Sequence, residues 1–224
     1  MTSPIPNRRD FTLSTGAALA AAALPLGWLP EAHAQGQAPK AGKDYQVLDP
    51  RAPVDTPAGK IEVIEFFWYS CPHCNDFEPA FEAWAKALPP DVGLRRVPVS
   101  FRADFLPQQK LYYTLEALGK VNELHVKVFH AIHVERLPIN TDGPIIDWAA
   151  KQGLDKAKFT EAYNSFSVTT KAKRASQLQD QYKVEGVPAL GIAGRYYTDG
   201  QMAGNMERAL RTTDFLIAQT RKGA

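Results

Sequence analysis

A strand, a helix and a second strand follow one another early in the chain, and this order constrains the fold more than any other feature. Residues 61–68 (IEVIEFFW) are rich in β-branched and aromatic side chains, which is typical of a buried central strand. Apolar residues at helical spacing then begin at Pro72, a favourable first helical residue, and continue to a Pro-Pro pair, with Pro79 expected to kink the helix. Residues 94–101 indicate the second strand. The pattern predicts a parallel βαβ unit with a right-handed crossover.

The sequence then changes character and predicts an all-helical insertion over about residues 104–184. Strand-like runs disappear there, and amphipathic segments follow one another. β character returns at residues 188–192 and 195–197, with Gly194 as a tight turn between them, and a last helix is expected over 206–221. This order favours one α/β domain with a helical insertion over two independent domains. The inserted helices are expected at about 107–119, at 121–135, from Thr141 or Asp142 onward, at 155–165 and at 168–183.

The first 34 residues have the features of a cleavable export signal. Arg8 and Arg9 precede a mostly small and apolar stretch, and Ala32-His33-Ala34 matches a cleavage site. The arginine pair also resembles a twin-arginine signal. The apolar stretch is short and interrupted by Pro25, so a retained membrane anchor is the weaker alternative. We expect a signal peptide at 1–34, export to the bacterial periplasm, and a mature domain over 35–224 that begins with a loose arm at 35–43.

The chain has only two cysteines, Cys71 and Cys74, among its 224 residues. This number excludes a scaffold of several disulfides and a four-cysteine zinc site. The formal net charge of +2 gives no reason to expect a nucleic-acid partner. A chain of this length buries a full core without disulfides, so the two cysteines are not needed to hold the fold.

The two cysteines lie in the motif Cys71-Pro72-His73-Cys74, between the first strand and its helix. A thiolate at Cys71 would be stabilised by the free N–H groups and positive end of the helix, and His73 adds a neighbour that can be cationic. Cys74 lies one turn further on and should be more covered. Each pKa unit removed from Cys71 stabilises its thiolate by about 1.4 kcal/mol and makes the couple more oxidising by roughly 30 mV. The motif favours a dithiol oxidant; the alternative is a structural bridge worth about 2 kcal/mol.

Two further features accompany the motif. Glu65 interrupts the apolar first strand, and a buried carboxylate is costly unless it is paired or has a task. It could relay the proton of Cys74, or it could point to a hydrated face of the sheet. Val187-Pro188 begins the later strand, where a cis peptide is accessible and the Val187 backbone could bind an extended peptide. The alternative for Pro188 is an ordinary edge-strand proline.

Together these residues resemble the thioredoxin superfamily, and the Phe66-Phe67 run, the Pro-His dipeptide and the insertion resemble its DsbA-type thiol oxidases. The resemblance implies a thioredoxin-like fold, with Cys71 as attacking cysteine, Cys74 as buried partner and His73 as tuning residue. It also implies a cis-proline loop at Val187-Pro188 and a buried acid at Glu65, with Glu78 and Arg96 as its charged neighbours. Arg96 stands where the family more often has lysine.

The resemblance further implies the reaction and its partners. The Cys71–Cys74 disulfide would oxidise unfolded exported proteins through a mixed disulfide, and a membrane-bound, quinone-linked oxidase of the DsbB type would restore it. No metal or organic cofactor is expected. Trp68 and Tyr69 could form an apolar rim for client chains or could pack in the core.

Several alternatives remain open on the sequence. A soft-metal carrier could use the cysteines with His73, or His125, His130 and His133 of the insertion, although nothing in the sequence places that helix near Cys71. A reductase or isomerase is the alternative within redox chemistry, and a glutathione-transferase-like enzyme is a weaker one. Few residues precede the first strand, so we expect no dimerisation module and a monomer.

Overall fold

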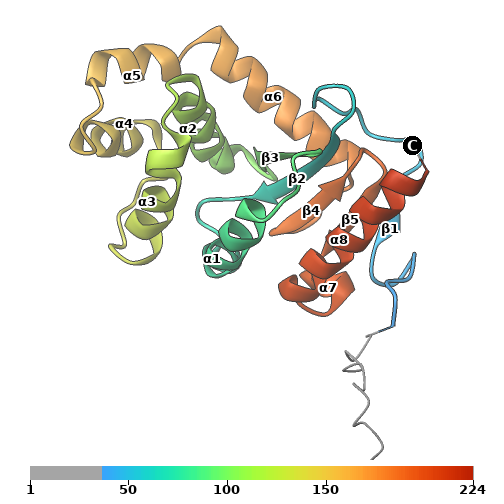
Figure 1. Ribbon diagram of the computed structural model, residues 1–224. Coiled ribbons are helices and arrows are strands. Elements are labelled where there is room, and N and C mark those ends of the chain that lie inside the picture. Colours follow the sequence, from blue (N-terminus) through green and yellow to red (C-terminus); the bar gives the residue numbers. More distant parts are fainter. Residues whose placement is uncertain (1–36, 224) are drawn as a thin grey trace, which may run out of the picture. The chain divides into compact units, whose positions relative to one another are not determined.

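A five-stranded mixed sheet organises residues 37–223, the part of the chain that the computed structural model describes (Figure 1). The strands lie in the order β1-β5-β4-β2-β3. Among these described strands β2 and the edge strand β3 are parallel, and every other neighbouring pair is antiparallel. The strands are β1 (Gln46–Val47), β2 (Ile61–Phe67), β3 (Val92–Pro98), β4 (Ala189–Ile192) and β5 (Tyr196–Asp199).

The parallel pair and helix α1 (Pro72–Lys86) confirm the expected βαβ unit. Pro72 lies at the start of the helix and Pro79 lies inside it. The expected end of the second strand at residue 101 is wrong, because β3 ends at Pro98. The Ser100 N–H leaves the ladder and donates to Gln179 Oε1 at 2.9 Å, so the chain turns away from the sheet there.

Alternation along β2 sends its side chains to two different apolar clusters. Val63 packs with α1 and with the C-terminal helix α8 (Met206–Lys222), through Phe81 and Leu216. Ile64 and Phe66 lie in the larger cluster, which includes residues of the inserted helices. Because side chains alternate along a strand, Glu65 lies on the same face as Val63, against α1. The buried acid therefore lies between the sheet and the helix that carries both cysteines.

Five helices between β3 and β4 confirm the predicted helical insertion. In Figure 1, α2 to α5 gather beside the β3 edge of the sheet, and the long α6 returns toward β4. Asp155 and Ser165 cap α5 and α6 by accepting from backbone N–H groups. A short 3₁₀ turn (Ala103–Phe105) leads into the insertion. Its helices are α2 (Leu106–Ala117), α3 (Val121–His133), α4 (Asp142–Lys151), α5 (Lys156–Tyr163) and α6 (Phe166–Gln181).

The returning hairpin has the turn that Gly194 predicts. Ala193 and Gly194 have φ values of 53° and 64°, and the Arg195 N–H donates to the Ile192 carbonyl at 2.9 Å. Gly191 is required for another reason: a Cβ there would lie 2.3 Å from the Tyr182 ring. A one-turn helix, α7 (Gly200–Ala203), precedes α8 and is not apparent from the sequence.

The N-terminal segment is less loose than expected from its composition. Asp44 is buried, accepts from the Lys40 N–H at 2.9 Å and pairs with Arg208 at 2.8 Å, so the segment is attached to α8. The short strand β1 follows and pairs with β5. The predicted signal peptide at 1–34 lies outside the described residues. Within residues 37–223 no helix combines the length and the apolarity that crossing a bilayer requires.

Candidate active site

The two cysteines flank the first turn of α1 and differ in their surroundings. Cys71 is the N-cap residue and accepts from the Asn75 N–H at 3.1 Å, while its side chain makes no cap hydrogen bond. Both cysteines are free thiols. Cys74 is fully buried, and Cys71 exposes 7% of its surface to solvent. Cys71 is thus less exposed than expected, although it is the more accessible of the two.

This arrangement separates the acidities of the two thiols. A hydrogen bond from the Cys74 side chain outweighs burial and, with the backbone N–H groups of Cys74 and His73 and the charge of His73, lowers the pKa of Cys71 to about 6. Burial, followed by the hydrogen bond to Cys71, raises the pKa of Cys74 well above its ordinary value. The reduced site therefore holds a thiolate at Cys71 and a thiol at Cys74 at neutral pH.

The Val187-Pro188 loop lies against Cys71. Its peptide bond is cis, and Cys71 Sγ lies 3.4 Å from the Val187 carbonyl oxygen, to which it donates when it is protonated. A groove of about 980 Å³ runs beside this contact, and its lining includes His73, Phe77 and Met206 as well as the loop. The structure thus brings His73, Val187 and Pro188 to one open surface next to the Cys71 sulfur.

The inserted helices hold the three residues that precede Cys71. Trp68 stacks on Phe105 with ring centroids 3.8 Å apart. The Tyr69 hydroxyl pairs with His125 Nδ1 at 2.9 Å, and the Tyr69 carbonyl accepts from His133 Nε2 at 2.8 Å. Gln108 of α2 bonds to the Ser70 hydroxyl at 2.7 Å and to the Ile139 carbonyl at 2.9 Å.

These contacts decide two points that the sequence left open. Tyr69 is a core residue with 1% exposure and does not form an apolar rim, because its ring fills the space between β2 and α3; Trp68 is partly exposed. The helix of the three histidines does lie near the motif, since His125 and His133 both bond to Tyr69. Gln108 was not singled out from the sequence. A polar side chain on the apolar face of an amphipathic helix is the sequence signal for such a residue. His125 shows this signal, because it lies on the same face of α3 as Val128 and Phe129.

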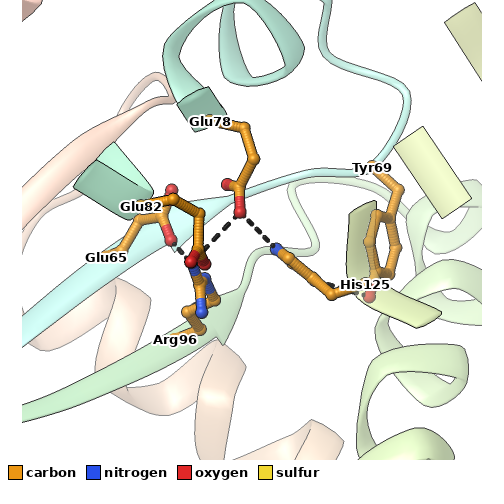
Figure 2. Close-up of polar contacts among 6 residues, drawn as sticks. All are labelled: Glu65, Tyr69, Glu78, Glu82, Arg96 and His125. Atoms are coloured by element: carbon orange, nitrogen blue, oxygen red, sulfur yellow. Dashed lines mark hydrogen bonds and ion pairs between the residues drawn. The ribbon is translucent and has the colours of Figure 1, made fainter. Parts of the chain in front are cut away.

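A largely buried charged cluster joins β2, β3 and α1, the helix that carries Cys74 (Figure 2). Arg96 on β3 donates to Glu65 at 2.9 Å, to Glu78 at 3.1 Å and also to Glu82. Glu65 is 1% exposed, so the alternative of a hydrated sheet face is excluded. Glu78 and Arg96 are the two neighbours that the family resemblance implies for this acid. Glu82, one turn beyond Glu78 on α1, is an addition that the sequence analysis did not identify.

Two buried carboxylates that share one guanidinium, Glu65 and Glu78, are costly to ionise together. Burial, reinforced by repulsion from Glu78, raises the pKa of Glu65 to about 8 in spite of Arg96. Burial also acts against ionised Glu78, but His125 and Arg96 outweigh it and lower the pKa of that carboxyl. At neutral pH the cluster keeps its proton on Glu65.

The fold and the site together define a class. A thioredoxin-like sheet with a helical insertion carries a Cys-x-x-Cys pair at a helix N-terminus, with one activated and one buried thiol, and this is the arrangement of a thiol:disulfide oxidoreductase.

Comparisons with known proteins agree with this class. The model of the DSBA-like thioredoxin domain family matches residues 62–211, and the chain belongs to that family. The chain is 47% identical over 211 residues to the thiol:disulfide interchange protein DsbA of Bordetella parapertussis, covering 94% of this chain and 96% of the relative. It is 40% identical over 184 residues to DsbA of Pseudomonas aeruginosa, covering 82% and 87% of the two chains.

Solved structures are similar in the same way. The crystal structure of Pseudomonas aeruginosa DsbA matches with a TM-score of 0.78 and 40% identity, over 82% of this chain and 95% of that one. The oxidoreductase DsbA from Xylella fastidiosa matches with a TM-score of 0.77 and 30% identity, over 82% and 98%. The fold and the thiol:disulfide interchange activity expected from the sequence are confirmed.

The comparisons support neither the reductase or isomerase alternative nor the metal carrier. His125 and His133 are engaged with Tyr69, and exposed His130 pairs with Glu135 at 2.9 Å. No group of three or more histidine, cysteine, aspartate or glutamate side chains within residues 37–223 is arranged to hold a metal ion.

Proposed function

We propose that the chain acts as a dithiol oxidase, which donates its Cys71–Cys74 disulfide to cysteine pairs of exported proteins. The observation that carries this direction is the contrast between the two sulfurs: one lies at the N-terminus of α1 and is stabilised as a thiolate, and the other is buried and protonated. Stabilising the reduced form makes the disulfide the stronger oxidant.

The reaction begins when a client thiolate attacks the Cys71 sulfur. A client–Cys71 disulfide forms, the Cys71–Cys74 bond breaks, and Cys74 leaves as a thiolate that takes up a proton. The second client thiolate then attacks the client sulfur of the mixed disulfide and displaces Cys71 as a stabilised thiolate. The client gains one disulfide, and the protein retains two electrons as the Cys71 thiolate and Cys74 thiol.

The neighbouring residues have assigned roles in this proposal. Pro72 starts the helix, and His73 contributes to stabilising the Cys71 thiolate. The Val187 backbone and Pro188 bind an extended client segment along the groove beside Cys71. Glu65, protonated at neutral pH, supplies the proton that Cys74 takes up, and its electrostatic influence on Cys74 supports this assignment.

Location and partners complete the proposal. The export signal expected at 1–34 directs the chain to the periplasm, where disulfides persist. A membrane-bound, quinone-linked oxidase of the DsbB type reoxidises the dithiol, and the protein acts as a monomer. The redox-active pair supplies the chemistry, without a metal or organic cofactor.

The redox equilibrium with glutathione tests the direction. A fall of the Cys71 pKa from 9.0 to about 6 makes the couple up to roughly 90 mV more oxidising than one with an ordinary thiol. Reduced glutathione in slight excess should therefore reduce the protein. A dithiol that stays oxidised until glutathione is in large excess would identify a reductant and contradict the proposal.

A further inference from the structure

His125 connects the helical insertion to the charged cluster. It lies on α3, is 3% exposed, and is surrounded by the rings of Phe67, Tyr112 and Phe129. Its Nδ1 lies 2.9 Å from the Tyr69 hydroxyl, and its Nε2 lies 3.4 Å from Glu78 Oε1 (Figure 2). Among the described residues, Nε2 has no partner with hydrogen-bond geometry, so its approach to Glu78 is an ion-pair contact. One imidazole thus links the loop before Cys71 with the helix that carries Cys74.

These two contacts determine where the imidazole proton lies. An ionised carboxylate can only accept, so the nitrogen that faces Glu78 must carry the hydrogen. Burial lowers the pKa of His125, although Glu78 opposes the effect, so the ring is neutral at pH 7. A neutral ring with its hydrogen on Nε2 has an unprotonated Nδ1, which accepts from the Tyr69 hydroxyl. Tyr69 thereby fixes the tautomer that supports Glu78.

The two buried acids of the charged cluster, Glu65 and Glu78, have different neighbours. Glu65 and Glu78 are both buried and both bond to Arg96, but only Glu78 has His125 as a second neighbour. The remaining oxygen of each carboxyl has no partner within the described part of the chain. Both acids share one guanidinium. His125 is the first of the neighbours that favour the ionised form of Glu78, with Arg96 and Glu82 after it, and Glu65 is the more deeply buried acid.

We propose that His125 is a positioning residue for the exchange reaction, because it keeps Glu78 ionised and so leaves the shared proton of the cluster on Glu65. The inference rests on the proposed role of Glu65 as proton donor to Cys74. When Cys74 leaves as a thiolate, the Glu65 proton moves to its sulfur, and Glu65 becomes the ion. With the proton on Glu78 instead, the thiolate would have no acid at Glu65 to protonate it.

Titratable or charged groups from several elements influence the sharing of a proton between Glu65 and Glu78. The groups that bear on it are Glu65 from β2, Tyr69 from the loop, Cys74, Glu78 and Glu82 from α1, Arg96 from β3, and Tyr112 from α2. Burial is the main cause that raises the pKa of Tyr69 and of Tyr112, so both phenols stay neutral over the relevant range. The titration that His125 influences is therefore the one shared by Glu65 and Glu78.

Two amide substitutions separate the contacts of the ring. The amide of Gln in His125→Gln reaches the place of Nε2 and can still donate to Glu78, whereas the shorter Asn in His125→Asn reaches only the place of Nδ1. His130→Gln on the same helix is the control, because His130 is exposed and, within residues 37–223, its only ion-pair partner is Glu135. Each full-length variant is titrated by carbon NMR of the Glu65 carboxyl and by the pH dependence of disulfide exchange with a cysteine peptide.

The wild-type Glu65 titration should be centred at about pH 8, and the exchange rate should decline as Glu65 loses its proton. His125→Asn should move both midpoints down by about one pH unit, the shift expected when one buried contact of Glu78 is lost. His125→Gln and His130→Gln should stay close to the wild type. If His125→Asn does not fold, Tyr69→Phe should shift the midpoints in the same direction but less, because the tautomer is no longer fixed.

Unchanged midpoints in His125→Asn, or equal shifts in the Asn and Gln variants, would overturn the role of His125. Either result leaves the proposed function intact as long as the wild-type protein oxidises thiols in equilibrium with glutathione. A wild-type protein that fails that equilibrium would instead remove the proposed function itself.

Discussion

The N-terminus of helix α1 and the buried end of its first turn shift the pKa of a cysteine in opposite directions. At the mouth, Cys71 faces backbone N–H groups and the open groove, and its pKa falls to about 6. Three residues further on, Cys74 has no exposed surface, lies near the protonated Glu65, and its pKa rises. The hydrogen bond between the two sulfurs, the backbone N–H groups at the helix terminus and the burial of Cys74 together make one sulfur a leaving group and the other a proton acceptor.

Replacing each sulfur in turn gives the largest expected effect. Cys71→Ser should reduce disulfide exchange by more than roughly a thousandfold, because a hydroxyl cannot enter the exchange. Cys74→Ser should still react at Cys71 with an activated disulfide and then accumulate a long-lived mixed disulfide, since no second sulfur can release it. Mass spectrometry after reaction with a disulfide peptide distinguishes the two. Stable adducts at residue 74 in Cys71→Ser would reverse the assignment.

The folding stability of the reduced protein should depend on pH in a way that the oxidised protein does not. The Cys71 pKa is lower in the folded chain, about 6, than the ordinary 9.0, so the unfolded chain binds more protons between these values. The free energy of unfolding of the reduced form should rise relative to the oxidised form from about pH 6 to 9, by no more than ~1.4 kcal/mol per unit, and be lost as pH falls through 6.

Urea denaturation of both redox forms across this range measures the difference. A reduced form whose relative stability is flat from pH 6 to 9 would show that the helix mouth does not favour the thiolate.

His73 should make a secondary contribution to the pKa difference between Cys71 and Cys74. Its backbone N–H and its charge are secondary contributions to the lowered pKa of Cys71, behind the Cys74 hydrogen bond. His73→Ala keeps the backbone and removes the charge, so it should raise the Cys71 pKa and move the glutathione equilibrium toward a weaker oxidant by roughly tenfold or less. A glutathione equilibrium identical to that of the wild type would assign the whole effect to the helix and Cys74.

The smallest effect on exchange is expected from the insertion. Gln108→Leu leaves the Ser70 hydroxyl and the Ile139 carbonyl without a bond from this buried side chain, which should cost about 1–3 kcal/mol of stability. Because neither bond reaches a sulfur, the exchange rate should change by less than roughly tenfold, as judged from thermal denaturation and peptide oxidation in parallel. A severe loss of exchange with unchanged stability would show that the insertion orients Cys71 directly.

The parts of this molecule that the sequence predicts are those encoded by short-range patterns. The run before the motif, the prolines around α1 and the spacing of the inserted helices specified the βαβ unit and the insertion. The ends of β3 and the existence of β1 and α7 could not be predicted, because they depend on tertiary partners such as Gln179 and β5.

The candidate site likewise has a part that the sequence predicts and a part that only the folded chain shows. Cys71, His73 and Cys74 are adjacent in sequence, so their chemistry follows from the motif alone. Gln108, His125 and His133 lie 38, 56 and 64 positions from their partners in the loop, and only the folded chain brings them together. In our proposal His125 influences whether Glu65 or Glu78 carries the proton, and no local pattern encodes its approach to Glu78.

Titration of the Cys71 thiolate in the reduced protein tests the central claim most directly. The ultraviolet absorbance of the thiolate, or its rate of alkylation, should rise with a midpoint at about pH 6, while Cys74 contributes no ionisation below pH 9. A single midpoint near 9.0, the ordinary value for a cysteine, would contradict the claim that the start of α1 stabilises this sulfur as an anion.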